Sequence, residues 1–333
     1  MPVPRLYPLR FEPILRRLIW GGRRLGTVLG KPIGAEADYA ESWELSDYHD
    51  QVSFVRGGRL QGVTLRDLIR SRPVELLGPA LAGLDQFPLL VKFIDAHQDL
   101  SVQVHPDDAK GRRLANDNGK TETWVVLAAE PGSVIYAGLK AGVGPEEFRQ
   151  AIASGQVEPL LHRFEAHPGD AILIEAGTVH AIGAGVMLAE IQQMSDATFR
   201  VFDWNRLGPD GQPRTLHIEQ AMESTDFALG PVDPMVPEVV ESRACGTRER
   251  LAASRYFACE RLRLRPTDPG DGFDIGQTDR FTILIGMEGK ATLLDGAETY
   301  ELALGETILL PASLGPCQVF SERGAVVLTC VVP

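Results

Sequence analysis

Short apolar or alternating runs, separated by Gly, Pro and Asp, cover most of the chain. This pattern is typical of an antiparallel β sandwich or barrel. Helical patterns are fewer. A capping-box-like start at Thr64 predicts a helix through Ile69, and the segment from Pro145 to Gly155 has Pro first, acids in its first turn and Gly last. We therefore expect a mainly β protein with a small helical insertion in its N-terminal half.

An internal repeat indicates that this β architecture occurs twice. Residues 169–180 (GDAILIEAGTVH) align with residues 305–316 (GETILLPASLGP). Each copy contains a glycine turn, an apolar strand and a second turn, and each follows a hairpin-like segment that ends in glycine, at Gly132 or Gly289. The repeat predicts two jelly-rolls in tandem.

The Pro-rich stretch 230–237 predicts a linker between two domains. A chain of 333 residues is also longer than most single hydrophobic cores support. We expect a metal-binding domain with short helical segments at 1–232 and a second jelly-roll at 238–333. His180 of the first repeat aligns with Pro316 of the second, and proline does not ligate metals. The C-terminal domain is therefore expected to lack metal ligands.

The charge balance restricts the partners of the chain. Acidic residues outnumber basic ones by 45 to 33, which gives a net charge of -12. Such a field repels nucleic acid and anionic membrane, so an anionic substrate needs cations gathered in a pocket. No stretch approaches the roughly 20 apolar residues of a membrane span. These features favour a small-molecule substrate, while the oligomeric state stays open.

The cysteines indicate a cellular compartment. All four lie in the last third of the chain and none shows the short paired spacing of a zinc-thiolate site: Cys245, Cys259, Cys317 and Cys330. Free thiols are typical of a reducing environment. We therefore expect a cytoplasmic protein.

Three short segments carry candidate metal ligands. Alternation along residues 100–105 places Ser101, Gln103 and His105 on one strand face. Lys120, Glu122 and Trp124 share a face in the same way, and His180 follows a glycine turn where a barrel can direct it inward. A lone histidine is more often structural than a ligand, but these segments can converge. The predicted ligands are Gln103, His105, Glu122 and His180, of which the amide is the least usual donor for zinc.

Two imidazoles, an amide and a carboxylate leave a divalent ion with a net positive charge, which suits a Lewis acid. The donors fit zinc, one ion per chain, although manganese, iron and cobalt accept the same atoms. Arg200 shares a strand face with Asp196 and Thr198, where it either binds an anionic substrate or pairs with the aspartate. Lys92 lies within an apolar run, and a charge buried in that way requires a partner or a function.

Four motifs resemble type I mannose-6-phosphate isomerases of the cupin superfamily, and the short bacterial form in particular. In chain order they are SVQVHPDD (101–108), GKTETW (119–124), GTVHAIG (177–183) and SDATFRVFDWNR (195–206). The resemblance runs from about Phe11 to Phe227. It implies a zinc enzyme that interconverts mannose 6-phosphate and fructose 6-phosphate, with metal ligands at the four positions above and an active-site arginine at Arg200. Departures at Met194, Ala197 and Phe199 affect the surroundings of the metal without removing a ligand.

Aldose and ketose interconversion removes a proton next to a carbonyl and returns it to the adjacent carbon through an enediol. We expect Arg200 and the metal to stabilise the enediol, and Ser101 with Lys92 or Lys120 to hold or neutralise the phosphate. The proton carrier stays open among Lys120, a water on the metal and an acid near the pocket.

Three other functions fit the same residues. They are an isomerase or epimerase of a different sugar phosphate, an iron-dependent cupin dioxygenase, and a regulator that binds sugar without turnover. Oxygen uptake distinguishes the dioxygenase, and turnover distinguishes the regulator.

Overall fold

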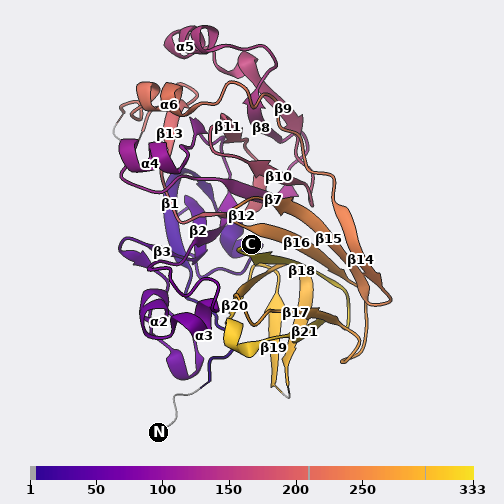
Figure 1. Ribbon diagram of the computed structural model, residues 1–333. Helices are drawn as coiled ribbons and strands as arrows, with labels where there is room; N and C mark the ends of the chain where they lie inside the picture. The colour runs from indigo at the N-terminus through magenta and orange to yellow at the C-terminus, as the bar shows by residue number, and fades with distance from the viewer. Residues whose placement is uncertain (1–4, 209–210, 297) are drawn as a thin grey trace.

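A computed structural model describes residues 5–208, 211–296 and 298–333. Strands dominate, as predicted, and form two curled assemblies (Figure 1). In this view the N-terminal part of the chain forms the top and the left side, and the strands of the C-terminal part lie at the lower right. The mainly β, tandem jelly-roll architecture is thereby confirmed.

The first jelly-roll consists of two sheets. The larger has six strands in the order β1-β2-β5-β12-β7-β10: β1 (Ile14–Gly22), β2 (Tyr39–Leu45), β5 (Leu89–Asp95), β12 (Val186–Gln193), β7 (Glu122–Ala129) and β10 (Ala171–Ile174). The smaller has five strands in the order β13-β6-β11-β8-β9: β13 (Phe199–Phe202), β6 (Val102–Val104), β11 (His180–Ile182), β8 (Val134–Leu139) and β9 (Leu161–Glu165). A two-stranded ribbon stands apart: β3 (Asp47–Tyr48) and β4 (Gln51–Val52).

The second jelly-roll is a nine-stranded sheet in which one long strand bends through both layers: β14 (Glu238–Arg243), β15 (Gly246–Ala253), β16 (Ala258–Leu264), β22 (Ala325–Val331), β18 (Thr282–Asp295), β21 (Cys317–Phe320) and β17 (Phe273–Ile275), with β19 (Glu298–Ala303) and β20 (Thr307–Leu310) paired to β18. Its order β14-β15-β16-β22-β18-β20 reproduces the order β1-β2-β5-β12-β7-β10 of the first half. The repeat seen in the sequence is therefore a repeat of topology.

The six α-helices of the described residues all belong to the N-terminal half: α1 (Arg24–Thr27), α2 (Leu65–Ser71), α3 (Pro73–Leu77), α4 (Asp108–Leu114), α5 (Pro145–Ser154) and α6 (Ile218–Ser224). Both predicted helices are confirmed. The Thr64 side chain caps α2 by accepting a hydrogen bond from Asp67 N at 3.0 Å. The C-cap of α5 is Gly155, whose φ of 68° is left-handed and therefore favours glycine. Three short 3₁₀ turns complete the list: η1 (Gly58–Leu60), η2 (Glu158–Leu160) and η3 (Ala312–Leu314).

Apolar side chains form separate cores inside and between the jelly-rolls. Equivalent strands fill the two interiors: Trp124, Ile172 and Leu188 in the first, and Leu284, Ile308 and Val327 in the second. A larger cluster joins the two large sheets, with members from both halves that include Phe93, Val125, Ile285 and Leu328. These strands are buried on both faces, and each face packs in a different core. This fixes their register, because a one-residue slip would exchange the side chains of the two faces.

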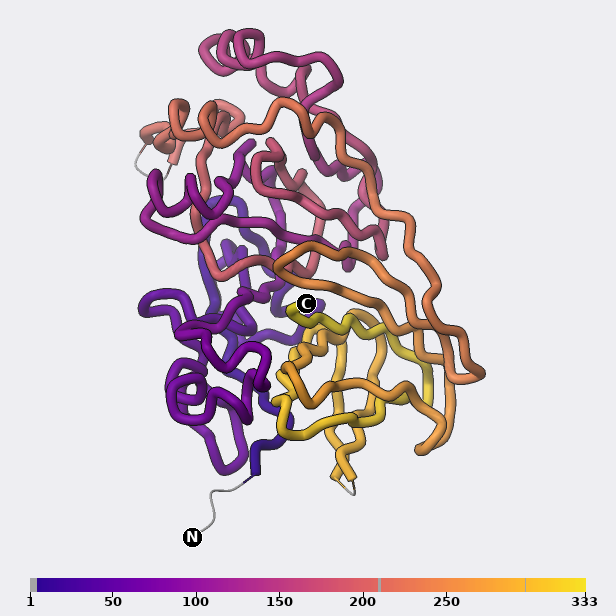
Figure 2. Tube along the Cα trace, in the orientation of Figure 1, coloured from indigo at the N-terminus to yellow at the C-terminus, as the bar shows by residue number. Residues whose placement is uncertain are grey.

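Residues 230–237 run in extended form along the outside of the first jelly-roll before β14 begins (Figure 2). Two backbone hydrogen bonds attach this segment, from Val232 N to Ala137 O at 3.0 Å and from Met235 N to Ala171 O at 2.7 Å. Among the described helices, none is sufficiently long and apolar to cross a membrane.

A buried ion pair joins three elements where the two central strands of the large sheet end or begin. The Asp95 carboxylate is fully buried and accepts hydrogen bonds from Arg24 N at 2.8 Å and Arg24 Nε at 2.7 Å. The same guanidinium donates to Gly185 O at 2.8 Å and Val186 O at 3.0 Å. The pair thus connects the start of α1 to the ends of β5 and β12.

We expect Asp95→Ala to lower the free energy of unfolding by about 3 kcal/mol, because it leaves the Arg24 charge partly buried without its partner. Chemical denaturation would measure the change. The matched control is Asp38→Ala, which removes an exposed carboxylate that pairs with Arg17 and should leave stability unchanged. Equal stability losses in the two variants would contradict this role of the buried pair.

Candidate active site and metal centre

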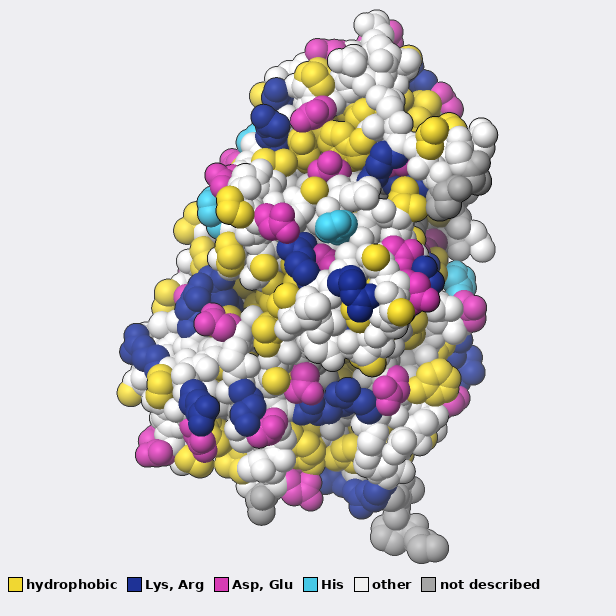
Figure 3. Space-filling model, turned by 180° about the vertical axis from the view of Figure 1, so that it is seen from behind, with side chains coloured by type: hydrophobic (Ala, Val, Ile, Leu, Met, Phe, Trp, Pro, Cys, Tyr) yellow, Lys and Arg dark blue, Asp and Glu magenta, His cyan; other side chains and the backbone are white. Residues whose placement is uncertain are grey.

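A recess of about 260 Å³ opens between the two sheets of the first jelly-roll. Its walls carry five cationic side chains and three anionic ones: Arg16, Lys92, Lys120, Arg200 and Arg214, against Glu41, Glu190 and Asp196. Figure 3 shows that on the face seen there, basic and acidic side chains are otherwise interspersed over the surface. The recess is therefore a local excess of positive charge in an acidic protein, as the sequence predicted.

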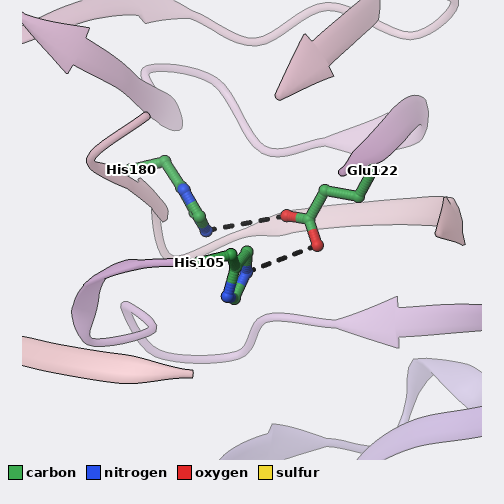
Figure 4. Close-up of side chains that lie close together, drawn as sticks. All are labelled: His105, Glu122 and His180. Carbon is green, nitrogen blue, oxygen red and sulfur yellow. Dashed lines mark ion pairs between the residues drawn. The ribbon is translucent and has the colours of Figure 1, made fainter. Parts of the chain in front are cut away.

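Three predicted ligands converge beside the recess, in contact with its lining residues Gln103 and Lys120 (Figure 4). His105 follows β6, Glu122 begins β7 and His180 begins β11, and all three side chains are buried. His105 Nε2 lies 3.4 Å from Glu122 Oε2, and His180 Nε2 lies 3.6 Å from Glu122 Oε1. One donor atom from each of the three lies within 4.8 Å of the others.

Backbone carbonyls orient both imidazole rings. His105 Nδ1 lies 2.9 Å from Ala197 O, and His180 Nδ1 lies 2.9 Å from Thr178 O. A carbonyl only accepts hydrogen bonds, so each Nδ1 carries the proton and donates it. Each Nε2 is then left with a lone pair directed toward Glu122. This is the outer hydrogen bonding that metal-binding histidines usually show.

The pKa directions agree with this arrangement. Burial lowers the pKa of His105 to about 3 and also lowers that of His180, so both rings are neutral. Burial alone would raise the pKa of Glu122, but the Lys120 ammonium together with His105 and His180 outweighs it and holds that pKa well below the usual range. Two neutral imidazoles and one carboxylate are the protonation states that metal binding requires.

The three converging groups are therefore hydrogen-bond acceptors that face one another. Within the described residues, His105 Nε2 and both Glu122 oxygens are buried and have no hydrogen-bond partner. The Lys120 ammonium, 3.0 Å from Glu122 Oε2, offsets part of the cost of these buried acceptors, and a divalent cation among them would satisfy the lone pairs that still face one another. The residues present thus fit a metal ion.

Gln103 completes the predicted ligand set from the strand beside His180. The two residues pair across β6 and β11, and Gln103 Nε2 lies 3.3 Å from His180 Nε2. The oxygen and nitrogen of a carboxamide are nearly equal in size, so a half-turn of this amide presents its oxygen to the same point. Gln103 can therefore act as the fourth ligand.

A chain of buried charges lies beside the predicted metal ligands and lines the recess. Lys120 Nζ is 3.0 Å from Glu122 Oε2 and 4.0 Å from Glu190 Oε1, while Lys92 Nζ is 2.9 Å from Glu190 Oε1. Burial alone would lower the pKa of Lys92, but Glu190 and Glu41 outweigh it and raise that pKa. Lys92 is therefore charged and paired with Glu190. This agrees with the expectation that a charge buried in an apolar run has a partner.

Arg200 and Ser101 also meet at the recess. Arg200 Nε donates to Ser101 Oγ at 3.2 Å and Nη1 donates to Thr215 O at 2.8 Å, so these two contacts orient the guanidinium. Burial, followed by the charge of Arg214, lowers the pKa of Arg200, although an arginine stays charged at any physiological pH. The alternative that Arg200 merely pairs with Asp196 has no support, because no ion pair joins them in the described structure.

The structure adds pocket residues that sequence reasoning missed. Glu190 is the single charge in a buried apolar strand, the same signal that singled out Lys92. Arg16 gave no such signal, since it lies in an edge strand among other arginines. Its guanidinium stacks over the Trp43 ring with its carbon 4.8 Å from the ring centroid, and it faces the recess. Only the pairing of β1 with β2 brings it there.

Comparisons with known proteins agree with the site. The model of the type I phosphomannose isomerase catalytic domain matches residues 9–126. A probable mannose-6-phosphate isomerase of Bacillus subtilis is 35% identical over 93% of this chain and 95% of its own length. The chain belongs to the mannose-6-phosphate isomerase family. A crystal structure of the Bacillus subtilis mannose 6-phosphate isomerase, 29% identical, covers 98% of this chain and 99% of its own with a TM-score of 0.87.

The family fold is also found in a mannose 6-phosphate isomerase bound with zinc and yttrium, which is 19% identical and covers 98% of this chain and 99% of its own with a TM-score of 0.76. The phosphomannose isomerase resemblance and the cupin fold expected from the motifs are confirmed. Of the departures from the family pattern, Ala197 contacts His105 through its backbone carbonyl. A change of side chain at that position therefore leaves the contact in place.

We expect Glu122→Gln to abolish stoichiometric zinc binding, because it removes the charge that the ion neutralises. Metal content after dialysis and thermal unfolding would measure this. In the unaltered protein a chelator should lower the unfolding temperature by about 5 °C or more, and it should have no effect on Glu122→Gln. His162→Gln, at a partly exposed imidazole that pairs with Asp233, is the control. Full zinc occupancy in Glu122→Gln would exclude this site.

Proposed function

We propose that the chain interconverts mannose 6-phosphate and fructose 6-phosphate at this recess, the activity of its family. The observation that carries the proposal is a cluster of buried acceptors, suited to a cation, directly beside a pocket lined by five basic side chains. A cluster of acceptors that can hold a cation, next to basic side chains, suits a substrate that carries both hydroxyl groups and a phosphoryl group. An oxygenase does not account for this charged wall, and turnover distinguishes the isomerase from a regulator that binds the sugar passively.

Gln103, His105, Glu122 and His180 would hold one zinc ion, by analogy with the zinc-bound structure of the same fold. When bound, the ion supplies a Lewis acid that polarises the sugar carbonyl or hydroxyl and favours loss of the neighbouring proton. The nitrogen and oxygen donors also accept other divalent metals. The described cysteines are all buried free thiols, which supports a cytoplasmic location.

The phosphoryl group requires cations that the protein has not already paired. Lys92 and Ser101 were predicted for this role, but Lys92 contacts Glu190 and Ser101 contacts Arg200. Arg16 lines the same recess, is partly exposed, and stacks on Trp43 without competing for its hydrogen-bond donors. We therefore assign Arg16 to the phosphoryl group, and we retain Ser101 and Lys92 as groups that orient Arg200 and balance the buried carboxylates.

Isomerisation also needs a proton carrier and a partner for the charge that develops on oxygen. Arg200, fixed by Ser101, is placed to stabilise the enediolate. Asp196 is exposed at the wall of the recess, and the surrounding protein atoms that displace part of its hydration raise its pKa. A carboxyl group with a raised pKa suits proton transfer near neutral pH. Lys120, between Glu122 and Glu190, is kept as a charged hydrogen-bond donor to the sugar oxygens.

Purified protein should convert mannose 6-phosphate to fructose 6-phosphate, lose this activity on chelation, and regain it with zinc. A coupled assay of fructose 6-phosphate measures all three results. Turnover that persists in metal-free protein would contradict the assigned chemistry. If zinc occupies the site but mannose 6-phosphate is not converted, the substrate assignment is wrong, and other hexose and pentose phosphates should then be tested.

Arg200 and Arg16 should affect different kinetic constants. Arg200→Ala is expected to lower kcat about 100-fold, because charge stabilisation in the transition state is lost. Arg16→Ala is expected to raise KM roughly tenfold with little change in kcat, since a phosphate contact is equally present in ground and transition states. Arg149→Ala, at an exposed arginine that pairs with Glu219, is the control. An unchanged kcat in Arg200→Ala would exclude its role.

A further inference from the structure

The second jelly-roll contains a cavity of about 170 Å³ at one end of its barrel. Strands β15, β16, β17, β18 and β22 and the turn after β17 supply its polar lining: Arg248, Arg250, Glu260, Asp274, Gln277, Thr282 and Thr329. The neighbouring interior farther along the same strands is apolar and filled, with Leu262, Leu284 and Val327. The polar end is therefore a distinct feature of this barrel.

The strand register shows that this cavity is the counterpart of the catalytic recess. Glu122 pairs with Ile174 in the first half, and Thr282 pairs with Leu310 in the second. Ile174 and Leu310 are equivalent in the sequence repeat. Thr282 therefore occupies the place of the metal ligand Glu122.

A second pair of strands supports the same equivalence. Lys92 pairs with Glu190 across β5 and β12, and Glu260 pairs with Thr329 across β16 and β22. The strand orders place Lys92 and Glu190 near Glu122, and Glu260 and Thr329 near Thr282. The first pair lines the catalytic recess and the second pair lines the cavity of the second jelly-roll. The second half therefore has the same strand framework around its cavity, with different side chains.

These replacements exclude a metal ion. A threonine hydroxyl stands where Glu122 supplies a carboxylate, and Pro316 stands where His180 supplies an imidazole. Neutral hydroxyl groups without imidazole or thiolate partners make poor ligands for zinc. A ligand of this cavity must therefore be held by hydrogen bonds.

Thr282 points to such a ligand. Its side chain lines the cavity and is 3% exposed, and its Oγ1 has no hydrogen-bond partner among the described residues. A buried hydroxyl without a partner is costly, so a partner that enters the cavity stabilises it.

The balance of charge defines the ligand class. Two cations, Arg248 and Arg250, face two anions, Glu260 and Asp274, whereas the catalytic recess has an excess of cations. Arg248 is already held by Glu260 at 3.3 Å and by Asp274 O at 2.7 Å. Guanidinium groups only donate and carboxylates only accept, so together they suit hydroxyl groups, which do both. A neutral lining gives no preference for a phosphoryl group.

We propose that this cavity binds an unphosphorylated sugar or polyol without a metal ion. The smaller volume, 170 Å³ against 260 Å³ in the catalytic recess, agrees with a ligand that lacks the phosphoryl group. The proposal rests on the lining of the second jelly-roll, and it holds whichever substrate the first one converts.

The test uses the full zinc-loaded chain with methyl α-mannoside and mannitol, neither of which can isomerise as an aldose. Isothermal titration should show saturable binding of at least one probe, at one site per chain, that persists when excess mannose 6-phosphate fills the catalytic recess. Thr282→Val should weaken this binding at least tenfold. Arg250→Ala, at a half-exposed arginine on the rim, should also weaken it, and neither variant should alter isomerase turnover.

Two further variants separate this site from the catalytic one. Thr299→Val, at an exposed threonine of β19, should bind the probe normally. Arg200→Ala should also bind it normally even though its turnover is impaired. The proposal is overturned if neither probe binds saturably in the millimolar range, if mannose 6-phosphate displaces the probe, or if Thr282→Val and Arg250→Ala both bind it as the unaltered protein does.

Discussion

Three buried acceptors that point at one another impose the strongest physical constraint on this protein. His105 and His180 present lone pairs to the Glu122 carboxylate, and their own protons are committed to backbone carbonyls on the far side of each ring. The arrangement is unfavourable in an apolar interior unless a cation lies at its centre. Much of the surrounding structure serves to hold these acceptors close to one another.

The scaffold achieves this with rigid elements. Two of these three residues, Glu122 and His180, begin strands, and His105 directly follows one, so strand pairing sets their separation. Lys120 and Lys92 alternate with Glu122 and Glu190 in a buried chain of charges, and each charge limits the freedom of the next. Pre-organisation of this kind suits electrostatic catalysis, because the groups need not reorient as the reaction proceeds.

The two jelly-rolls have equivalent backbones but different side chains in their cavities, so the backbone alone does not determine the chemistry of either cavity. Equivalent strands, in the same order and register, carry Glu122 in one half and Thr282 in the other. The apolar interiors are conserved in kind, since both barrels must exclude water to fold. The polar ends are free to differ, and they make one recess with an excess of cations and another without net charge.

The sequence by itself determined the local features of this protein. Alternation placed Gln103 and His105 on one strand face, caps marked the helices at Thr64 and Gly155, and the repeat gave the tandem architecture. These features depend on neighbours a few residues apart, and their periodicity is visible in a single chain. The tertiary structure alone decided that Lys92 pairs with Glu190, that Arg16 reaches the recess and that each imidazole carries its proton on Nδ1. Except for the contact of His180 with Thr178, which lies two residues away, those contacts join residues far apart in the sequence, and they exist only once the sheets have closed and set the strand register.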